Sequence, residues 1–298
     1  MSAVRDEASR LGFRLTLPAQ VLVLFISLFP LLMQLYISLT DWSPLSGQPW
    51  PQAWQMWNYF ANYTDLVQDS RLWSALGRTF FIMLVCVPVE FLLGLGLATL
   101  FMDEFPGKRF AYSVLLMPMM VVPAVAGYMF YMLFQSGGPI NDILSFMTAS
   151  QVTVAWLSDP SLALFAVMVA DIWQWTPLMF LILLAGLAGV PEDQLKAATL
   201  LGANSWQRFT SIVLPRMKTI IGIALAIRVI ECFKIFDTLY IMTGGGPGVA
   251  TETISVYIYK IATQDLIWGY VAAIALAILI VLSVVCVLAL NRMARVRL

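Results

Sequence analysis

The sequence predicts an all-α membrane protein with six transmembrane helices and both ends of the chain in the cytoplasm. Apolar residues make up 60% of the 298 residues and charged residues only 11%, a composition outside the range of soluble domains. Six apolar segments approach the roughly 20 residues that a helix needs to cross a bilayer. Their runs are continuous rather than alternating, which favours helices over a β-barrel.

The expected spans follow one another without a polar region large enough to hold a core of its own. The whole chain, 1–298, is therefore expected to form a single transmembrane domain. The first apolar segment is too long for a secretory signal, and no A-x-A-like cleavage site follows it, so it should remain as a span. The six spans are placed at residues 15–39, 76–101, 110–134, 160–186, 217–241 and 268–290.

Basic residues gather on one side of the predicted spans, and cytoplasmic loops are the ones enriched in Lys and Arg. The opposite side holds Arg71, Lys260 and, at a span boundary, Arg78. Both termini and the polar segment after the fourth span are thus predicted to be cytoplasmic. Twelve of the 17 Lys and Arg residues lie on the basic side: Arg5, Arg10, Arg14, Lys108, Arg109, Lys196, Arg208, Arg216, Lys218, Arg292, Arg295 and Arg297.

The polar segment at 191–209 is predicted to form a short helix, a bend and a second helix. Pro191 suits a first helical position, and Glu192 complements the positive end of a helix dipole. Gly202 can adopt the left-handed conformation that ends a helix, and Asn204 or Ser205 can cap the next one. Ala197 and Ala198 leave a smooth patch, so the segment is interpreted as a cytoplasmic docking surface.

The fifth span contains ionisable residues at membrane depth, where each costs a few kcal/mol and normally faces protein or water. Arg228, Glu231, Lys234 and Asp237 alternate in sign at a spacing of three, so each lies beside the next on a helix. Three interpretations remain open: a self-neutralised row packed against other helices, a hydrophilic translocation path, or an ion relay. Alternating signs argue against a selective ion filter.

Two lone acids, Glu90 and Asp171, lie in the second and fourth spans and can pair with the basic residues of the fifth. Asp171 leads into Trp173-Gln174-Trp175, a group able to stack on and hydrogen-bond a sugar ring; an interfacial Trp pair is the alternative. Prolines punctuate three spans and predict bent helices: Pro88, Pro118, Pro123 and Pro177.

Several chemistries are excluded. The chain has no His, which removes His-based relays, His metal sites and Ser-His catalysis. Cys86, Cys232 and Cys286 all fall within predicted spans, so they are expected to be packing residues rather than a disulfide framework. No catalytic residue, metal site or bound cofactor is expected, and no nucleic-acid partner.

The polar segment also carries a spaced motif. Lys196-Ala197-Ala198, then Gly202, Ile212 and Leu214-Pro215, reproduce the spacing Glu-Ala-Ala, three residues, Gly, nine residues, Ile, one residue, Leu-Pro. This motif resembles the one that marks membrane permeases of binding-protein-dependent ABC importers, with Lys196 in place of the family's Glu. The carbohydrate-uptake, maltose-type branch is further indicated by Leu17-Pro18, Phe29-Pro30, the run 38–42, Asn58-Tyr59, Pro118, the run 138–141, the run 173–177, Phe236-Asp237 and the run 243–247.

The resemblance implies a type I ABC importer permease fold in a bacterial cytoplasmic membrane. Such a subunit forms half of a translocation pathway by alternating access, here for a di- or oligosaccharide. Its implied partners are a second, homologous permease, two ABC ATPase subunits and an extracytoplasmic sugar-binding protein. The chain lacks a G-x-x-x-x-G-K-[ST] loop, so ATP and Mg are expected to be used by the partner ATPase.

The resemblance also assigns roles to residues. ATPase coupling is expected of Glu192, Lys196, Ala197, Ala198, Gly202, Ala203, Arg208 and Phe209. The substrate pathway is expected to include Glu90, Asp171, Trp173, Trp175, Glu231, Lys234, Phe236 and Asp237. Two alternatives compete with this function: an ion-coupled secondary transporter or channel that uses the charges of the fifth span, and a scaffold subunit without transport activity.

Overall fold

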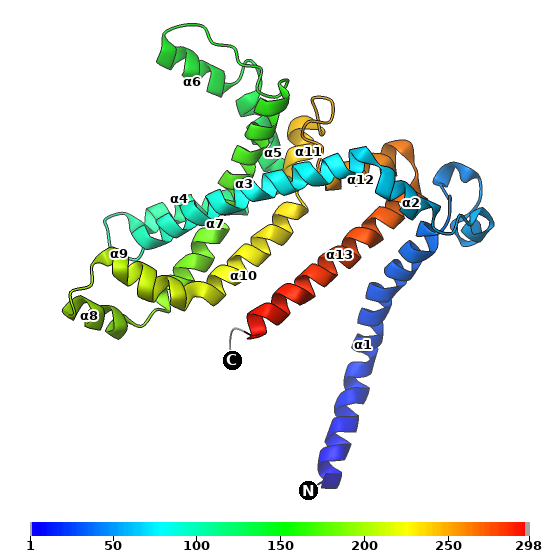
Figure 1. Cartoon of the computed structure of the whole chain (residues 1–298), viewed down its shortest axis with the longest axis horizontal. Coiled ribbons are helices and arrows are strands. Elements are labelled where there is room, and N and C mark those ends of the chain that lie inside the picture. The colour runs from blue at the N-terminus through cyan, green and yellow to red at the C-terminus, as the bar shows by residue number, and fades with distance from the viewer. Residues whose placement is uncertain (1, 296–298) are drawn as a thin grey trace. The chain divides into compact units, whose positions relative to one another are not determined.

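The computed structural model describes residues 2–295, with side chains from Phe13 to Val287 apart from Arg14 and Cys286. In this part of the chain every regular element is a helix, and the only strand-like feature is one isolated bridge between Thr40 and Trp57. The chain divides into two compact units, Met1–Ser70 with Ile258–Leu298, and Arg71–Tyr257. Each is described by itself (Figure 1).

The first unit contains the helices from the N-terminal and C-terminal parts of the chain. Its elements are α1 (Ser2–Ser38), η1 (Pro44–Ser46), η2 (Trp50–Met56), α2 (Ala61–Gln68), η4 (Ile261–Asp265) and α13 (Trp268–Arg295). Helix α13 packs against α1 and α2. The buried amide of Asn62 donates hydrogen bonds to the carbonyls of Ser38 at 2.9 Å and Thr40 at 3.0 Å, and so satisfies backbone groups left free where α1 ends. The indole rings of Trp42 and Trp268 meet edge to face at 5.7 Å.

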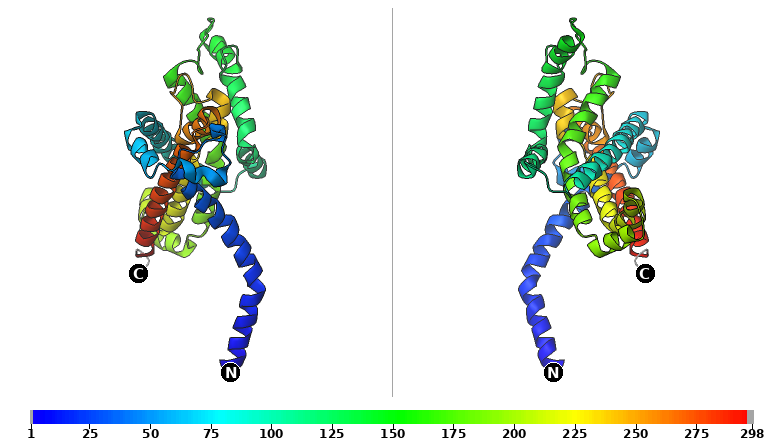
Figure 2. Two further views of the ribbon diagram at one scale, coloured as in Figure 1. Left: turned by 90° about the vertical axis from the view of Figure 1, so that its right-hand side faces the viewer. Right: turned by 90° about the vertical axis from the view of Figure 1, so that its left-hand side faces the viewer.

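The second unit is built around α7 (Figure 1, Figure 2). Helices α4, α5, α10 and α11 pack against α7, and α5 lies along α11. Its core draws apolar side chains from α3, α5, α7, α10, α11 and α12. Its elements are α3 (Ser70–Leu100), α4 (Lys108–Met120), α5 (Pro123–Phe134), α6 (Pro139–Thr148), α7 (Pro160–Ala188), α8 (Glu192–Leu200), α9 (Ser205–Arg208), the π-helical turn η3 (Phe209–Val213), α10 (Leu214–Phe233), α11 (Asp237–Thr243) and α12 (Ile254–Lys260).

Local sequence explains why α7 begins where it does. The carboxylate of Asp159 accepts hydrogen bonds from the backbone N–H groups of Ser161 at 2.9 Å and Leu162 at 3.0 Å, and Pro160 occupies the first turn. The hydroxyl of Ser161, together with these amides, lowers the pKa of Asp159. Small buried residues along α7, such as Ala163, let neighbouring helices approach closely.

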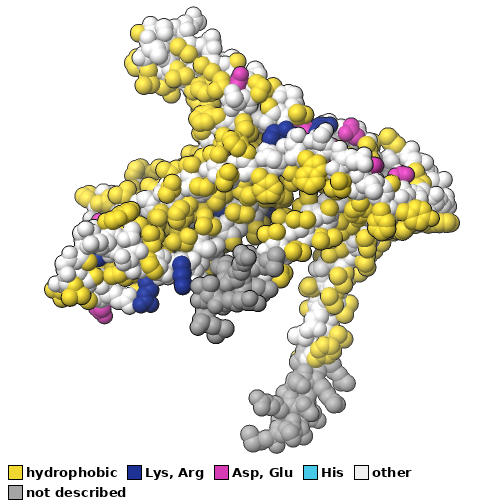
Figure 3. Space-filling view, in the orientation of Figure 1, with side chains coloured by type: hydrophobic (Ala, Val, Ile, Leu, Met, Phe, Trp, Pro, Cys, Tyr) yellow, Lys and Arg dark blue, Asp and Glu magenta, His cyan; other side chains and the backbone are white. Residues whose placement is uncertain are grey.

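Apolar side chains cover much of the face drawn in Figure 3, as expected for helices in contact with lipid. Within the described residues, four helices are long and apolar enough to cross a membrane, and a fifth crossing results if α4 and the helices after Val122 count as one span bent by 99°. The four are Leu15–Ser38, Ser70–Leu100, Pro160–Ala188 and Trp268–Val285.

The predicted third and fifth spans are not single helices: the bend expected at the prolines of the third is a full break, and the fifth is interrupted where no break was expected. The segment 110–134 breaks between α4 and α5, because Pro123 lacks an N–H and holds Val122 in an extended conformation. The segment 217–241 ends its helix at Phe233 and resumes at Asp237. The other four predicted spans each correspond to a single helix.

The break before α5 has its own polar support. The Gln174 side chain of α7 donates a hydrogen bond to the Val121 carbonyl at 2.9 Å, and the Thr238 hydroxyl of α11 donates to the Pro123 carbonyl at 3.0 Å. Both side chains are buried. The backbone beside a break in a membrane helix needs polar partners from its neighbours, and these two side chains supply them on either side of this break.

The expectations for the cysteines and for the basic residues can be compared with the structure only in part. Cys86 and Cys232 are buried free thiols, which confirms them as packing residues. Cys286 and six of the basic side chains used to orient the chain lie outside the described side chains: Arg5, Arg10, Arg14, Arg292, Arg295 and Arg297. The orientation of the chain in the membrane stays a prediction.

Gly94 offers a test of the packing between α3 and α7. A Cβ on Gly94 would lie 2.8 Å from the Met179 Cβ and 2.9 Å from the Phe180 nitrogen, whereas a Cβ on Gly96 would meet nothing within 4 Å. We expect Gly94→Val to destabilise the protein by about 1–3 kcal/mol through overpacking and Gly96→Val to have little effect. Apparent melting temperatures in detergent measure both; equal temperatures would contradict the close approach of the two helices.

Candidate functional site

A buried cluster of charges joins three helices of the second unit. Arg228 of α10 is 1% exposed, and its Nη2 donates a hydrogen bond to the Glu90 Oε1 of α3 at 2.9 Å and another to the Asp171 carboxylate of α7. Its Nε also donates to Glu90. The guanidinium lies 5.2 Å from the centre of the Trp175 ring, a cation–π contact. The prediction that both acids pair with a basic residue of the fifth segment is confirmed.

The cluster explains how three charged groups are tolerated in an apolar core. Each ion loses hydration on burial, and the forked guanidinium repays part of that cost by bonding two carboxylates at once. The Nη1 of Arg228 is buried without a hydrogen-bond partner in the described part of the chain. The cluster thus contains two acidic side chains, Glu90 and Asp171, and one basic side chain, Arg228.

The predicted row of charges along one helix is wrong. Glu231 and Lys234 do form an ion pair, with the Lys234 Nζ 2.9 Å from Glu231 Oε1. Arg228, however, turns to α3 and α7, and Asp237 begins a different helix. The cause is the end of α10 at Phe233, which interrupts the periodicity that the pattern assumed.

A cavity of about 230 Å³ lies where the two helix breaks meet. Pro123 contributes from the break before α5, and Glu231 together with the residues from Lys234 to Thr238 contributes from the break between α10 and α11. Trp175 and Phe236 provide aromatic surface, beside charged groups able to hydrogen-bond a polar ligand. The cavity is lined by Pro123, Asp171, Trp175, Glu231, Lys234, Ile235, Phe236, Asp237 and Thr238.

Six of the eight residues predicted for a pathway line this cavity, and two do not. Glu90 is bonded to Arg228 behind it, and the Trp173 ring packs in the core at 5.3 Å from Phe130. Sequence reasoning missed the supporting role of Gln174 and Thr238. The signal was the Pro123 break, which required polar partners at membrane depth.

The polar segment after α7 forms the expected helix, bend and helix, α8 and α9. Gly202 has a φ of +84°, the left-handed conformation predicted for the bend. Asn204 caps α9 in a reciprocal capping box with Gln207. Pro191 lies one position earlier than predicted, at the N-cap of α8. Arg208 donates hydrogen bonds to the hydroxyls of Thr199 at 2.7 Å and Ser205 at 3.1 Å, which ties α9 to α8.

Lys196, the residue that departs from the motif, pairs with a neighbour on the same helix. Its ammonium lies 2.8 Å from the Glu192 carboxylate one turn earlier, and this hydrogen bond lowers the pKa of Glu192. Both side chains are exposed. Of the other residues predicted for coupling, Ala197 and Gly202 are exposed, while Ala198, Ala203, Arg208 and Phe209 are half-buried.

An apolar tip on this helix pair was not predicted. Leu200 and Leu201 are each 89% exposed and Trp206 is 70% exposed. Isolated exposed apolar residues are ordinary, but three within seven positions of a polar segment are surface that a partner could bury. Two successive leucines, Leu200 and Leu201, in an otherwise polar segment were the sequence signal for this tip.

A helical chain with several membrane-crossing helices, a polar cavity at two helix breaks and an exposed helix pair defines a multi-pass membrane transport subunit. Residues 59–297 match the family of binding-protein-dependent transport system inner membrane components. The chain belongs to this family.

Relatives of at least 30% identity are named as permease proteins of transport systems. A probable ABC transporter permease protein of Sinorhizobium fredii is 38% identical over 82% of this chain and 77% of its own length. The trehalose/maltose transport system permease protein MalF of Thermococcus litoralis is 32% identical over 87% of this chain and 85% of its own. The trehalose transport system permease protein SugA of Mycobacterium tuberculosis is 35% identical over 89% and 86%.

The fold is also that of a solved importer chain. A chain of a bacterial ABC transporter involved in the import of the acidic polysaccharide alginate superposes with a TM-score of 0.81 and 19% identity, over 99% of each chain. The fold is therefore that of an ABC importer permease.

The buried cluster predicts a specific pattern of stability. Arg228→Ala leaves two buried carboxylates without a counter-ion, and we expect a loss of about 3–5 kcal/mol. Lys234→Ala breaks an ion pair whose lysine is 59% exposed and should cost roughly 0–1 kcal/mol. Melting temperatures in detergent compare the two.

A triple variant separates charge from packing. Arg228→Met combined with Glu90→Gln and Asp171→Asn removes all three charges, so we expect it to recover part of the stability lost in Arg228→Ala. If the triple variant is no more stable than Arg228→Ala, the cluster does not act through the pairing of charges.

Proposed function

We propose that this chain is the permease subunit of an ATP-driven, binding-protein-dependent importer of a carbohydrate, in which it forms half of the translocation pathway. The cavity at the two helix breaks is the observation that carries the proposal. It combines Trp175 and Phe236, which can stack on a sugar ring, with Asp237, Glu231 and Lys234, which can bond its hydroxyls. Family membership and the relatives named for trehalose or maltose transport support a di- or oligosaccharide as the substrate.

The topology follows from the helices and the basic residues together. We propose six membrane crossings, of which the third and fifth are broken, with both termini and the α8–α9 pair on the cytoplasmic side of a bacterial inner membrane. Lys108, Arg109, Arg216 and Lys218 lie on that side in this arrangement, as the distribution of basic residues predicts.

The helix pair α8–α9 is proposed to couple the chain to a separate ATPase, which uses ATP and Mg. The capping box and the bonds from Arg208 hold the two helices as one rigid piece. Its apolar tip of Leu200, Leu201 and Trp206 presents surface for a partner to bury. The complete importer would contain a second, homologous permease, two ATPase subunits and an extracytoplasmic sugar-binding protein.

Alternating access needs rigid parts joined at defined hinges. The Arg228 cluster holds α3, α7 and α10 together, whereas the breaks at 121–122 and 234–236 interrupt helices beside the cavity. Motion at these breaks changes the cavity without separating the clustered helices. ATP and the binding protein drive such motion only if they bind the two states with different affinities.

Reconstitution tests the proposal directly. The chain is placed in proteoliposomes with candidate permease, ATPase and binding-protein partners, and uptake of labelled sugar is measured. We expect uptake to require ATP and the binding protein and to be unchanged when ion gradients are collapsed. Uptake that follows an ion gradient without ATP would support the secondary-transporter alternative instead.

The bend at Gly202 provides a mutational test of coupling. A side chain there is strained because φ is +84°, although a Cβ would meet nothing within 4 Å. We expect Gly202→Val to lower sugar-stimulated ATP hydrolysis several-fold by misdirecting α9, and Gly202→Asn to keep most of it, since Asn tolerates this conformation. Equal stimulation in both variants would remove the bend from the coupling mechanism.

The charge pair on α8 provides a second test. Lys196→Glu places two carboxylates one turn apart, while Glu192→Lys combined with Lys196→Glu restores an opposite-charge pair. If only the local pair matters, the double variant should assemble and transport like the original. If Lys196 itself contacts acids of the ATPase, both variants should lose assembly, which co-purification of the ATPase measures.

A further inference from the structure

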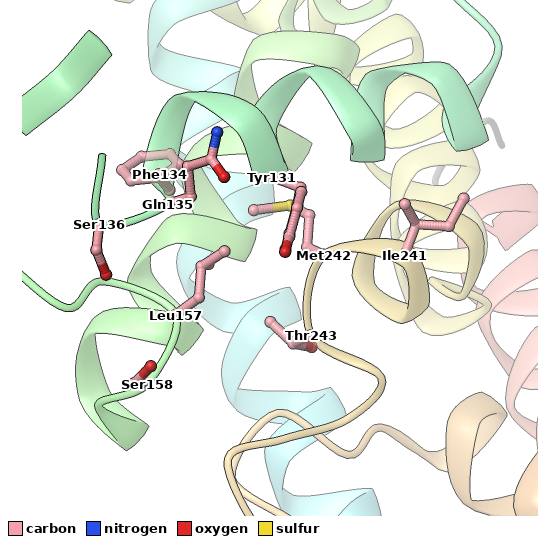
Figure 4. Close-up of a pocket in the computed structure, with 9 residues that line it drawn as sticks. All are labelled: Tyr131, Phe134, Gln135, Ser136, Leu157, Ser158, Ile241, Met242 and Thr243. Atoms are coloured by element: carbon pink, nitrogen blue, oxygen red, sulfur yellow. The ribbon is translucent and has the colours of Figure 1, made fainter. Parts of the chain in front are cut away.

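A second, larger cavity lies at the other end of α11. Its volume is about 430 Å³, within the roughly 300–1,000 Å³ range of small-molecule sites. Figure 4 shows that its lining comes from the end of α5, the segment before α7 and the end of α11, with Leu157, Met242 and the Tyr131 hydroxyl directed toward the space between them. The lining residues are Tyr131, Phe134, Gln135, Ser136, Leu157, Ser158, Ile241, Met242 and Thr243.

The lining is polar but carries no charge. Among the described residues, the side chains of Tyr131, Gln135, Ser136 and Ser158 make no hydrogen bond within the protein, so two kinds of group, hydroxyl and amide, are free to bond a ligand. Phe134, Leu157, Ile241 and Met242 supply apolar surface. The first cavity differs, because it is lined by Asp171, Glu231, Lys234 and Asp237.

One wall of this cavity is held by a buried asparagine. Asn141 is 3% exposed, and its Nδ2 donates to the carbonyls of Ser136 and Val154, each at 2.9 Å. Its Oδ1 accepts from the Trp156 indole at 2.9 Å and from the Val154 N–H at 3.2 Å. A single side chain thereby fixes the segment that holds Ser136 against the segment that leads to Leu157 and Ser158.

The opposite wall is held by the loop after α11. The hydroxyls of Thr243 and Thr251 lie 2.7 Å apart. Glu252 follows directly and is fully buried, with Arg71 donating to both of its carboxylate oxygens at 2.8 and 2.9 Å. The walls are thus fixed in advance by bonds that leave the cavity-facing groups of Tyr131 and Ser158 unused, as in a preorganised binding site.

We propose that this cavity is a second carbohydrate site, which holds a neutral, polyhydroxylated sugar on the extracytoplasmic side before it reaches the cavity between α10 and α11. This rests on the proposed function. Free hydroxyl and amide groups match sugar hydroxyls, and the apolar side chains match the faces of the ring. An anionic sugar would lose hydration without a cationic partner in this cavity. Figure 1 places α5 and α11 at the end of their unit away from α8 and α9, which the proposed topology puts in the cytoplasm.

Saturation-transfer NMR on the full chain in lipid nanodiscs tests this site. The probes are a panel of neutral di- and trisaccharides that includes maltose and trehalose, and maltobionate as an anionic counterpart of maltose. We expect Tyr131→Phe to weaken binding of the neutral sugar about twofold to tenfold, as expected for one lost hydrogen bond. Ser158→Trp should fill the cavity and abolish the signal that arises there.

Tyr128→Phe is the matched control, because Tyr128 lies on the same helix, is 60% exposed and does not line the cavity. We expect it to bind like the original chain and maltobionate to bind more weakly than maltose. The proposal is overturned if no neutral sugar of the panel binds, if Tyr131→Phe and Ser158→Trp bind as the original does, or if maltobionate binds as well as maltose. It is also overturned if Ser158→Trp changes only the docking of the binding protein.

Uptake in the reconstituted importer keeps this proposal separate from the proposed function. Ser158→Trp should raise the sugar concentration needed for half-maximal uptake several-fold and leave ATP hydrolysis without sugar unchanged. ATP-driven uptake that is identical in Ser158→Trp and the original chain overturns the second site and leaves the importer function standing. Uptake that does not require ATP in the original chain overturns the importer function itself.

Discussion

The bonds from Arg228 to Glu90 and Asp171 are the interaction on which the unit 71–257 depends most. Helices in a membrane gain little from the hydrophobic effect on associating, so packing and polar contacts decide which helices stay together. Here one guanidinium joins α3, α7 and α10. Because Arg228, Glu90 and Asp171 are all buried, removal of one partner leaves the others without a replacement for the lost bond. The same cluster fixes Trp175 beside the cavity, and thus connects stability to the candidate site.

Polar groups at the helix breaks have a related role. Gln174 donates to the Val121 carbonyl before the break and Thr238 to the Pro123 carbonyl after it. The two side chains come from α7 and α11, which border the cavity between α10 and α11. Residues of both helix breaks line this space, and the polar groups supply the hydrogen bonds that a broken helix needs in lipid. Helix α11 runs from this charged cavity to the uncharged one near Tyr131. The two cavities, which differ in chemistry, therefore lie at opposite ends of one short helix.

Much of the fold could be predicted because its signals are local. The four unbroken spans follow from runs of apolar residues, and the helix, bend and helix at 191–209 follow from Pro191, Gly202 and Asn204. The motif spacing was enough to indicate the family, since its residues are close together in the chain. The bend of the third span was predicted from Pro118 and Pro123. The interruption of the fifth span was missed, because residues 217–241 contain no proline and hydropathy alone does not register where one helix ends and the next begins.

The sequence by itself determined that the chain resembles a helical membrane permease, that Gly202 can end a helix, and that Glu90 and Asp171 can pair with basic residues of the fifth span. Only the tertiary structure decided that both acids share Arg228, because that choice depends on how α3, α7 and α10 are turned toward one another. It also decided which residues surround each cavity. Those residues are up to 115 positions apart, from Pro123 to Thr238, and no local pattern links them.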